Sequence, residues 1–335
     1  MTTTNTTKLG KTGPSVFPIA LGCMSMGAGS AYGKSDEAEG VATIHAALDR
    51  GVNLIDTGDF YGMGKNEMLV GRALKDRRDK AVLSVKFGGL RAPDMTFLGM
   101  DTRPIAVKSF LAHSLSRLGV DYIDVYRPSR LDPAVPIEDT IGAVADMVKA
   151  GYVRHIALSE VGVDTIRRAA KVHPIVDLQI EYSVVTRNAE EKIFPVLAEL
   201  GIAVTAYGVL SRGLLAGSKT VGPGDMRAHM PRFSGENAVK NQALVDALAR
   251  MAQKRGVSSA QLAVAWVRAK GAAHGVTVIP TMGARTRQQM AEALAGLDVA
   301  LTPADLAEIE AAVPASEIAG TRYPAPLMAT LDSER

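Results

Sequence analysis

The chain has 335 residues, of which 47% are hydrophobic and 22% are charged, and its formal net charge is only +3. This composition is typical of a globular protein with a large core, and it indicates neither a nucleic-acid nor an anionic-membrane partner, because Lys and Arg form no dense block. Cys23 is the single cysteine, which excludes an internal disulfide and a thiol metal cluster. The N-terminal residues lack a signal pattern and no apolar run could span a bilayer, so we expect a cytoplasmic protein.

Segments typical of strands alternate with segments typical of helices along the chain. The predicted strands are 17–21, 52–55, 81–85, 122–126, 153–158, 176–180, 203–206 and 276–279. The predicted helices are 37–49, 67–74, 104–118, 137–149, 163–172, 189–200, 237–255, 258–270, 286–295 and 303–312. Four helices run into a glycine suited to a left-handed turn and then into a strand, at Gly51, Gly119, Gly151 and Gly201. These junctions are typical of the helix-to-strand turns of a parallel sheet.

Eight strands, each followed by a helix, predict an α/β fold: one (β/α)8 TIM barrel domain over residues 1–335, with an extra C-terminal helix and a tail. The alternative is a doubly wound sheet. That fold usually binds phosphate through a Gly-x-Gly-x-x-Gly motif after its first strand, and this chain has no such motif there.

Three polar residues follow predicted strands where a barrel would hold its chemistry. Asp56 comes directly after the apolar run at 52–55, Tyr61 lies in the next loop, and Lys86 closes the strand at 81–85. A lysine ammonium beside a phenol favours the phenolate and lowers the tyrosine pKa, and a carboxylate keeps the lysine charged and in place. The three could therefore form one proton-donating unit. The same spacing also fits a loop-capping acid, a half-buried tyrosine and a salt-bridged lysine.

The other strand ends carry groups that suit a nucleotide better than a metal. Gln179 and Ser159 can pair with an amide, and Tyr207 offers a flat face for stacking. The loop at 281–287 precedes a helix and contains two arginines, which suits a phosphate. The strand ends lack the carboxylate and histidine cluster of a divalent metal site. Together they predict a nicotinamide dinucleotide across the barrel mouth.

Several motifs, in this order along the chain, resemble those of the aldo-keto reductase superfamily. They are Val52-Asn-Leu-Ile-Asp56-Thr-Gly-Asp-Phe-Tyr61-Gly, Lys86, Val153-Arg-His-Ile-Ala-Leu-Ser159, Gln179-Ile-Glu-Tyr182, Tyr207-Gly-Val-Leu-Ser-Arg-Gly-Leu-Leu, and Ile279-Pro with Gly283-Ala-Arg285. The likeness extends from about residue 9 to residue 297. It is nearest to the microbial reductases related to pyridoxal reductases and potassium-channel β subunits. It implies an oxidoreductase that uses NADPH to reduce an aldehyde or ketone to the alcohol, with a pyridoxal-like aldehyde or a bulky ketone as candidate substrates.

The resemblance also implies a role for each matching residue. Tyr61 would donate the proton, Lys86 would lower its pKa, Asp56 would orient Lys86, and Ser129 would stand at the fourth catalytic position. The carboxamide would be held by Ser159 and Gln179. The full cofactor-binding set is Gly22, Met24, Asp56, Ser159, Gln179, Tyr207, Gly208, Val209, Leu210, Ser211, Arg212, Gly283, Arg285, Gln289 and Glu292. In that set Tyr207 would stack on the nicotinamide, 208–212 would follow the pyrophosphate, Gly283, Arg285 and Gln289 would meet the 2′-phosphate, and Glu292 the adenine.

Three residues depart from the family pattern. Ser129 stands where the family usually has a histidine, and a serine can donate a hydrogen bond but is no acid at neutral pH. Glu160 replaces the usual asparagine beside the carboxamide. Gln289 replaces an arginine that many members place on the 2′-phosphate, which leaves Arg285 as the candidate for that contact.

Two classes of function stay open on this evidence: a carbonyl reductase, and a cofactor-sensing binding protein with little turnover, like the channel β subunits. The residues that select the substrate are expected in the loops 87–103 and 217–235 and in the tail 321–335. An apolar pocket is expected from Met24, Met26, Phe87, Phe97, Met100 and Tyr323.

Overall fold

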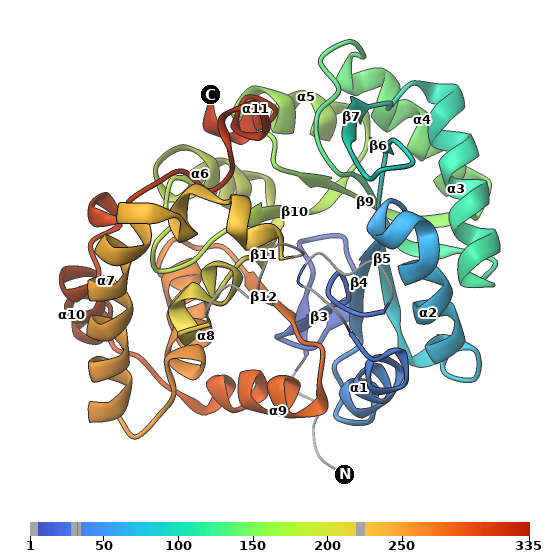
Figure 1. The fold of residues 1–335 in the computed structure, drawn as a ribbon. Coiled ribbons are helices and arrows are strands. Elements are labelled where there is room, and N and C mark those ends of the chain that lie inside the picture. Colours follow the sequence, from blue (N-terminus) through green and yellow to red (C-terminus); the bar gives the residue numbers. More distant parts are fainter. Residues whose placement is uncertain (1–5, 28–31, 33–34, 219–224) are drawn as a thin grey trace.

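In the computed structural model, eight parallel strands close into a barrel surrounded by helices (Figure 1), which confirms the predicted fold. The structure describes residues 6–27, 32, 35–218 and 225–335. Around the barrel, the strand order is β10-β11-β12-β3-β4-β5-β8-β9. The barrel strands are β3 (Ala20–Gly22), β4 (Leu54–Gly58), β5 (Val82–Phe87), β8 (Ile123–Pro128), β9 (Val153–Ser159), β10 (Ile175–Glu181), β11 (Ala203–Tyr207) and β12 (Val278–Gly283).

Helices cover the outside of the barrel, and their apolar faces pack on the strands. The helices are α1 (Glu37–Asp49), α2 (Lys65–Leu74), α3 (Pro104–Leu118), α4 (Ile137–Lys149), α5 (Val163–Val172), α6 (Ala189–Leu200), α7 (Gly235–Lys254), α8 (Ser259–Ala273), α9 (Arg287–Ala295), α10 (Pro303–Ala312) and α11 (Ala325–Met328). Six of them, α1, α3, α4, α5, α6 and α10, have the predicted bounds. The four junction glycines have φ between 65° and 87°, as the left-handed turn requires.

Two short hairpins lie outside the barrel sheet, and both were missed by the sequence prediction. The first pairs β1 (Thr7–Lys8) with β2 (Ser15–Val16), and its Leu9 and Val16 belong to the same apolar cluster as Leu54 and Ile279 near the strand beginnings. This hairpin therefore closes the lower end of the barrel. The second pairs β6 (Gly89–Arg91) with β7 (Phe97–Met100) directly after β5, at the end where the strands finish.

The barrel strands extend further toward the mouth than the sequence predicted. β4 continues to Gly58, β5 to Phe87 and β12 to Gly283. Asp56 and Lys86 therefore lie within strands and not after them, which corrects the prediction. Near the mouth, the barrel interior is lined by polar side chains that hydrogen-bond to one another. The apolar runs in the sequence therefore end before the strands do, and backbone pairing between strands continues through the polar residues. In the part of the chain that the structure describes, we find no helix with the length and apolarity that a bilayer crossing needs.

Candidate active site

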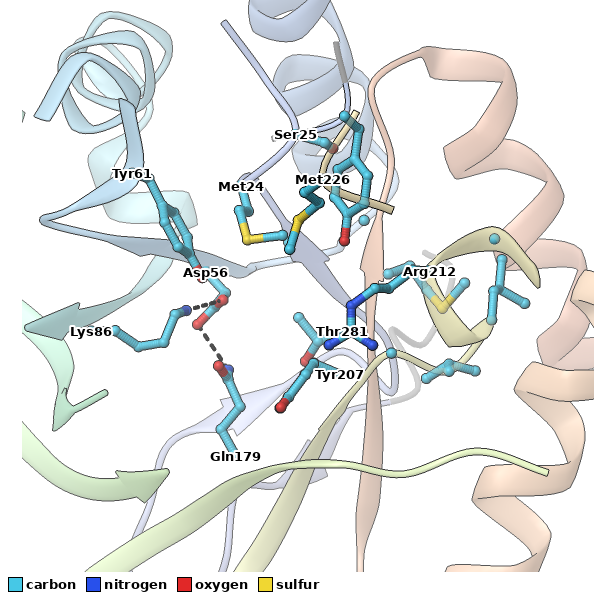
Figure 2. Close-up of a pocket in the computed structure, with 18 of the residues that line it drawn as sticks. Met24, Ser25, Asp56, Tyr61, Lys86, Gln179, Tyr207, Arg212, Met226 and Thr281 are labelled. Atoms are coloured by element: carbon cyan, nitrogen blue, oxygen red, sulfur yellow. Dashed lines mark hydrogen bonds and ion pairs between the residues drawn. The ribbon is translucent and has the colours of Figure 1, made fainter. Parts of the chain in front are cut away.

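A buried ion pair between neighbouring strands forms the centre of the site. Asp56 on β4 and Lys86 on β5 are 5% and 4% exposed, and Lys86 Nζ lies 2.5 Å from Asp56 Oδ2. The other carboxylate oxygen accepts from Ser84 Oγ and from Gln179 Nε2, each at 3.0 Å. Figure 2 shows Asp56 between Lys86 and Gln179. With both oxygens bonded, Asp56 has a defined position next to the Lys86 ammonium.

Tyr61 lies above this pair, in the 3-10 turn Tyr61–Gly64 that follows β4. Lys86 Nζ is 5.1 Å from the centre of its ring, and the side chain points toward Asp56 and Lys86 in Figure 2. A Cβ at Gly58 would come within 3.4 Å of the ring. The backbone of β4 is thus part of the surface against which the phenol packs, and this helps to fix its place beside the ammonium.

The electrostatics of Tyr61 differ from the expected lowering by Lys86. Burial holds the pKa of Tyr61 well above its usual value, the Asp56 charge raises it further, and Arg130 lowers it. Burial also lowers the pKa of Lys86, while Asp56 raises it. The reason is desolvation, which disfavours phenolate and ammonium alike. In the protein alone, Tyr61 is therefore a protonated phenol, the form that can give up a proton.

These groups line a cavity of about 580 Å³ at the barrel mouth. All of the predicted site residues line it except Ser159 and Ser211, which are buried beside it. Ser159 Oγ accepts from Arg130 at 3.5 Å, and Ser211 Oγ accepts from Arg232 at 3.4 Å. Of the expected apolar pocket, Met24, Phe97, Met100 and Tyr323 line the cavity, whereas Met26 and Phe87 are core residues. Part of the expected substrate loop, residues 219–224, lies outside the described residues.

Glu160, one of the three departures from the family pattern, binds the C-terminal segment. Glu160 is fully buried at the end of β9, and both of its oxygens accept from Arg322, at 3.0 and 2.9 Å. Ser333 Oγ donates to it at 2.5 Å and the Tyr207 hydroxyl at 2.7 Å. Burial opposes the charge, but Arg322 and the hydrogen bonds bring the pKa of Glu160 to about 2. Glu160 is thus an anchor for the C-terminal segment.

The C-terminal segment makes polar contacts in the site that sequence reasoning did not predict. The Tyr323 hydroxyl lies 3.0 Å from that of Tyr207 and accepts from Arg130 Nη2 at 3.4 Å. The guanidinium carbon of Arg212 lies 4.4 Å from the centre of the Tyr323 ring. The tail therefore contacts the hydroxyl of Tyr207, the residue that was expected to stack on a nicotinamide. No local pattern near Tyr323 signals this contact, because its partners lie far away in sequence.

The far end of the cavity suits an anion. Arg285 follows β12, and its Nη1 donates to the Tyr32 carbonyl oxygen at 3.2 Å. Gln289 lines the cavity as well, and its Oε1 accepts from the Arg285 backbone N–H at 2.8 Å. A Cβ on Gly283 would meet no atom within 4 Å, so a ligand can approach the backbone there.

Two buried hydroxyls test whether the site fits a nicotinamide dinucleotide. Ser25 Oγ and Thr281 Oγ1 line the cavity, and neither has a hydrogen-bond partner among the described residues. A buried hydroxyl without a partner costs free energy, so a polar ligand at these two points relieves a real deficit. Ser211 and Arg212 have φ of 46° and 57°, a strained backbone of the kind found at ligand loops. The donors present therefore fit such a cofactor. Among the described residues, no group of His, Cys, Asp and Glu could hold a metal ion.

Comparison with known proteins points to one family. Residues 18–314 match the model of the aldo/keto reductase family. The chain is 39% identical to probable aldo-keto reductase 1 of Glycine max over 323 residues, covering 94% of this chain and 91% of that protein. Among solved structures it resembles the glycerol dehydrogenase AKR11B4 from Gluconobacter oxydans, with a TM-score of 0.81, 30% identity and coverage of 94% and 97% of the two chains. The holo form of aldo-keto reductase AKR11C1 from Bacillus halodurans gives a TM-score of 0.73, 26% identity and coverage of 92% and 96%. The chain therefore belongs to the aldo/keto reductase family.

Proposed function

We propose that the protein is an NADPH-dependent carbonyl reductase that converts an aldehyde or ketone to its alcohol, with Tyr61 as the proton donor. The observation that carries this proposal is the phenol of Tyr61 beside the Lys86–Asp56 pair in the wall of a large cavity. Membership of the aldo/keto reductase family supports NAD(P)H-dependent carbonyl reduction in general. The name of the Gluconobacter relative supports testing the reverse oxidation of an alcohol as well.

When bound, the nicotinamide cofactor supplies the hydride. In this proposal Tyr207 packs against its ring, Gln179 and Ser159 hold its carboxamide, and Ser25 and Thr281 gain the partners that they lack. The backbone at 208–212, with its left-handed residues, follows the pyrophosphate. The remaining contacts, from Gly22, Met24, Gly283, Arg285, Gln289 and Glu292, line the same cavity.

The chain's own residues then divide the proton chemistry. Tyr61 gives its proton to the carbonyl oxygen as charge develops there. The Lys86 ammonium favours the phenolate that is left behind, and Asp56 holds the ammonium in position. Ser129 is 4% exposed and its Oγ lies 3.6 Å from Met100 Sδ. Its hydroxyl can orient a carbonyl but cannot share the acid role.

The proposal is tested by following NADPH absorbance with a panel of aldehydes and ketones, and NADP⁺ with alcohols. We expect turnover with at least one compound class and no activity without cofactor. Tight NADPH binding without turnover across the panel would instead favour a cofactor-sensing protein with little activity.

Arg285 provides a separate test of the cofactor. A guanidinium binds a phosphate monoester as a bidentate partner, whereas NADH offers only a hydroxyl at that point. Arg285→Ala should weaken NADPH binding about 10–100-fold and leave NADH binding nearly unchanged, as measured by fluorescence titration. Equal losses for the two cofactors would show that Arg285 does not bind the phosphate. Arg287→Ala is a matched control, because Arg287 pairs with Glu39 at 2.9 Å on the exterior.

A further inference from the structure

The arginines of the cavity fall into two groups. Five line it, and two of them have a carboxylate partner: Arg212 Nη2 lies 3.2 Å from Glu181, and Arg227 Nη2 lies 2.5 Å from Asp225. Arg91, Arg130 and Arg285 have no carboxylate within 4.0 Å in the described ranges. Arg285 lies at the proposed phosphate end. Arg91 and Arg130 belong to the other end, near Tyr61.

Arg130 directly follows Ser129, and its direct hydrogen bonds go to neutral groups, although the negative charge of Glu160 lies near enough to act on it. Its Nη1 donates to the Ser129 carbonyl oxygen at 2.6 Å and its Nη2 to the Tyr323 hydroxyl at 3.4 Å. It also lies close enough to Tyr61 for its charge to lower the pKa of that phenol. Burial opposes this charge, and Glu160, the carboxylate that favours it, is already bound through both oxygens by Arg322.

Arg91, on the β6–β7 hairpin, is in a similar situation. Its Nη1 donates to the Met95 carbonyl oxygen at 3.0 Å, and the Phe97 ring centre lies 5.4 Å from its guanidinium carbon. Its Nε is buried and has no hydrogen-bond partner among the described residues. Burial lowers the pKa of Arg91, and Tyr61 raises it. The Arg91 side chain lines the cavity without a carboxylate partner among the described residues, so its guanidinium can offer an anion a charge-assisted hydrogen bond.

The acidic groups of the cavity cannot neutralise these two arginines. Only Asp56 and Glu292 among the lining residues are acidic; Asp56 is bonded to Lys86, and Glu292 lies on α9 at the opposite end. Glu160 acts on the charge of Arg130 but is bound by Arg322, so an anion from outside the chain could be the direct partner of both arginines.

We propose that the substrate is an aldehyde or ketone that carries a carboxylate, which Arg91 and Arg130 bind while the carbonyl faces Tyr61. This inference rests on the proposed function and narrows it to one substrate class. It also gives the β6–β7 hairpin a role, since the hairpin is the element that brings Arg91 to the mouth.

The test compares substrates that differ only in charge. Succinic semialdehyde and para-formylbenzoate are each assayed beside their methyl esters, with NADPH. We expect each acid to have a kcat/KM at least about tenfold above that of its ester, because a charge-assisted hydrogen bond typically contributes a factor of about 10–100. Ester turnover equal to or better than acid turnover would overturn the inference and leave the proposed reductase intact. If no acid, ester or other carbonyl compound is reduced, the proposed function itself fails.

Substitutions of the two arginines test whether they cause the preference for acids over esters. Arg91→Met and Arg130→Met should each lower the ratio of acid to ester kcat/KM about tenfold or more. Because the charge of Arg130 also acts on Tyr61, Arg130→Met is scored on that ratio and not on ester turnover. Arg130→Lys should restore part of the preference because the charge remains. Arg72→Met is the matched control, since Arg72 is exposed and pairs with Glu37 on the exterior.

Calorimetry with para-(hydroxymethyl)benzoate and NADP⁺ gives a readout independent of turnover. Unchanged carboxylate affinity in both methionine variants would contradict the assignment.

Discussion

The barrel interior contains two ion pairs one above the other, and they differ in what surrounds them. In the lower pair, Arg127 and Asp177 are both fully buried; Thr205 donates to Asp177 at 3.1 Å, and Arg127 Nη2 donates to Ser84 Oγ at 2.8 Å. In the upper pair, Lys86 and Asp56 line the open cavity. Ser84 links the two, because its hydroxyl accepts from Arg127 and donates to Asp56. Both are ion pairs between a basic and an acidic residue, but the lower pair stabilises the barrel and the upper pair lines the binding cavity.

The largest effect is expected at the upper pair. Tyr61→Phe keeps the ring and removes the proton, so carbonyl reduction should fall about 10²–10⁴-fold. NADPH binding and the melting temperature should hardly change, because the packing against Gly58 remains. Steady-state kinetics with a fluorescence titration measure both. An undiminished rate in the purified variant would remove Tyr61 from the mechanism.

The lower pair should respond in stability. Arg127→Met leaves Asp177 buried without a counter-charge, which should reduce the free energy of unfolding by about 3–5 kcal/mol. Urea denaturation measures the loss. The double variant Arg127→Met with Asp177→Leu should recover most of it, since the uncompensated charge is then absent. A loss below about 1 kcal/mol in the single variant would contradict the contrast between the two pairs.

Ser129 tests how much of the proton transfer depends on groups other than Tyr61. A single neutral hydrogen bond contributes about 0.5–1.5 kcal/mol, so Ser129→Ala should slow reduction by no more than roughly tenfold. NADPH affinity should be unchanged. Ser129→His should obstruct a bulky ketone more than a small aldehyde, if the pocket is shaped around the smaller residue. A loss on Ser129→Ala as large as that of Tyr61→Phe would make Ser129 an essential group.

Asp59, two residues before Tyr61, is a buried acid without a basic hydrogen-bond partner among the residues described, in contrast to the two ion pairs. It should therefore make the free energy of unfolding depend on pH. Burial, then the charge of Glu67, raises its pKa from 3.8 to about 7; Oδ2 accepts from the Gly88 N–H, while Oδ1 has no partner in the described chain. An acid with a raised folded pKa binds its proton more tightly when folded. Its contribution to the free energy of unfolding therefore falls as pH rises from about 4 to about 7. Asp59→Asn should abolish that part of the pH dependence, measured by urea denaturation at about pH 5 and about pH 8. An equal change in the free energy of unfolding between the two pH values in the wild-type protein and in Asp59→Asn would contradict this prediction.

Local sequence patterns predicted most of the framework and the centre of the site. Amphipathic helices that end at a glycine are determined by neighbouring residues, and the Asp56–Lys86–Tyr61 group follows from barrel geometry. What sequence reasoning missed depends on distant partners. The β6–β7 hairpin has no strong strand pattern, and the burial of Glu160 depends on distant residues such as Arg322, 162 positions away. The raised pKa of Tyr61 likewise comes from burial in the folded cavity, which no spacing reveals.

The pairing of Glu160 with Arg322 also imposes an order on biosynthesis. A growing chain exposes the end of β9 before its partner exists, and at 5–20 residues per second the 162 intervening residues take roughly 10–30 s to make. During that interval the carboxylate has to stay hydrated, because its burial without Arg322 is costly. The mouth of the barrel is therefore completed only after residues 322–334 have been synthesised, and a nascent chain whose other strands are already paired still lacks a finished binding cavity.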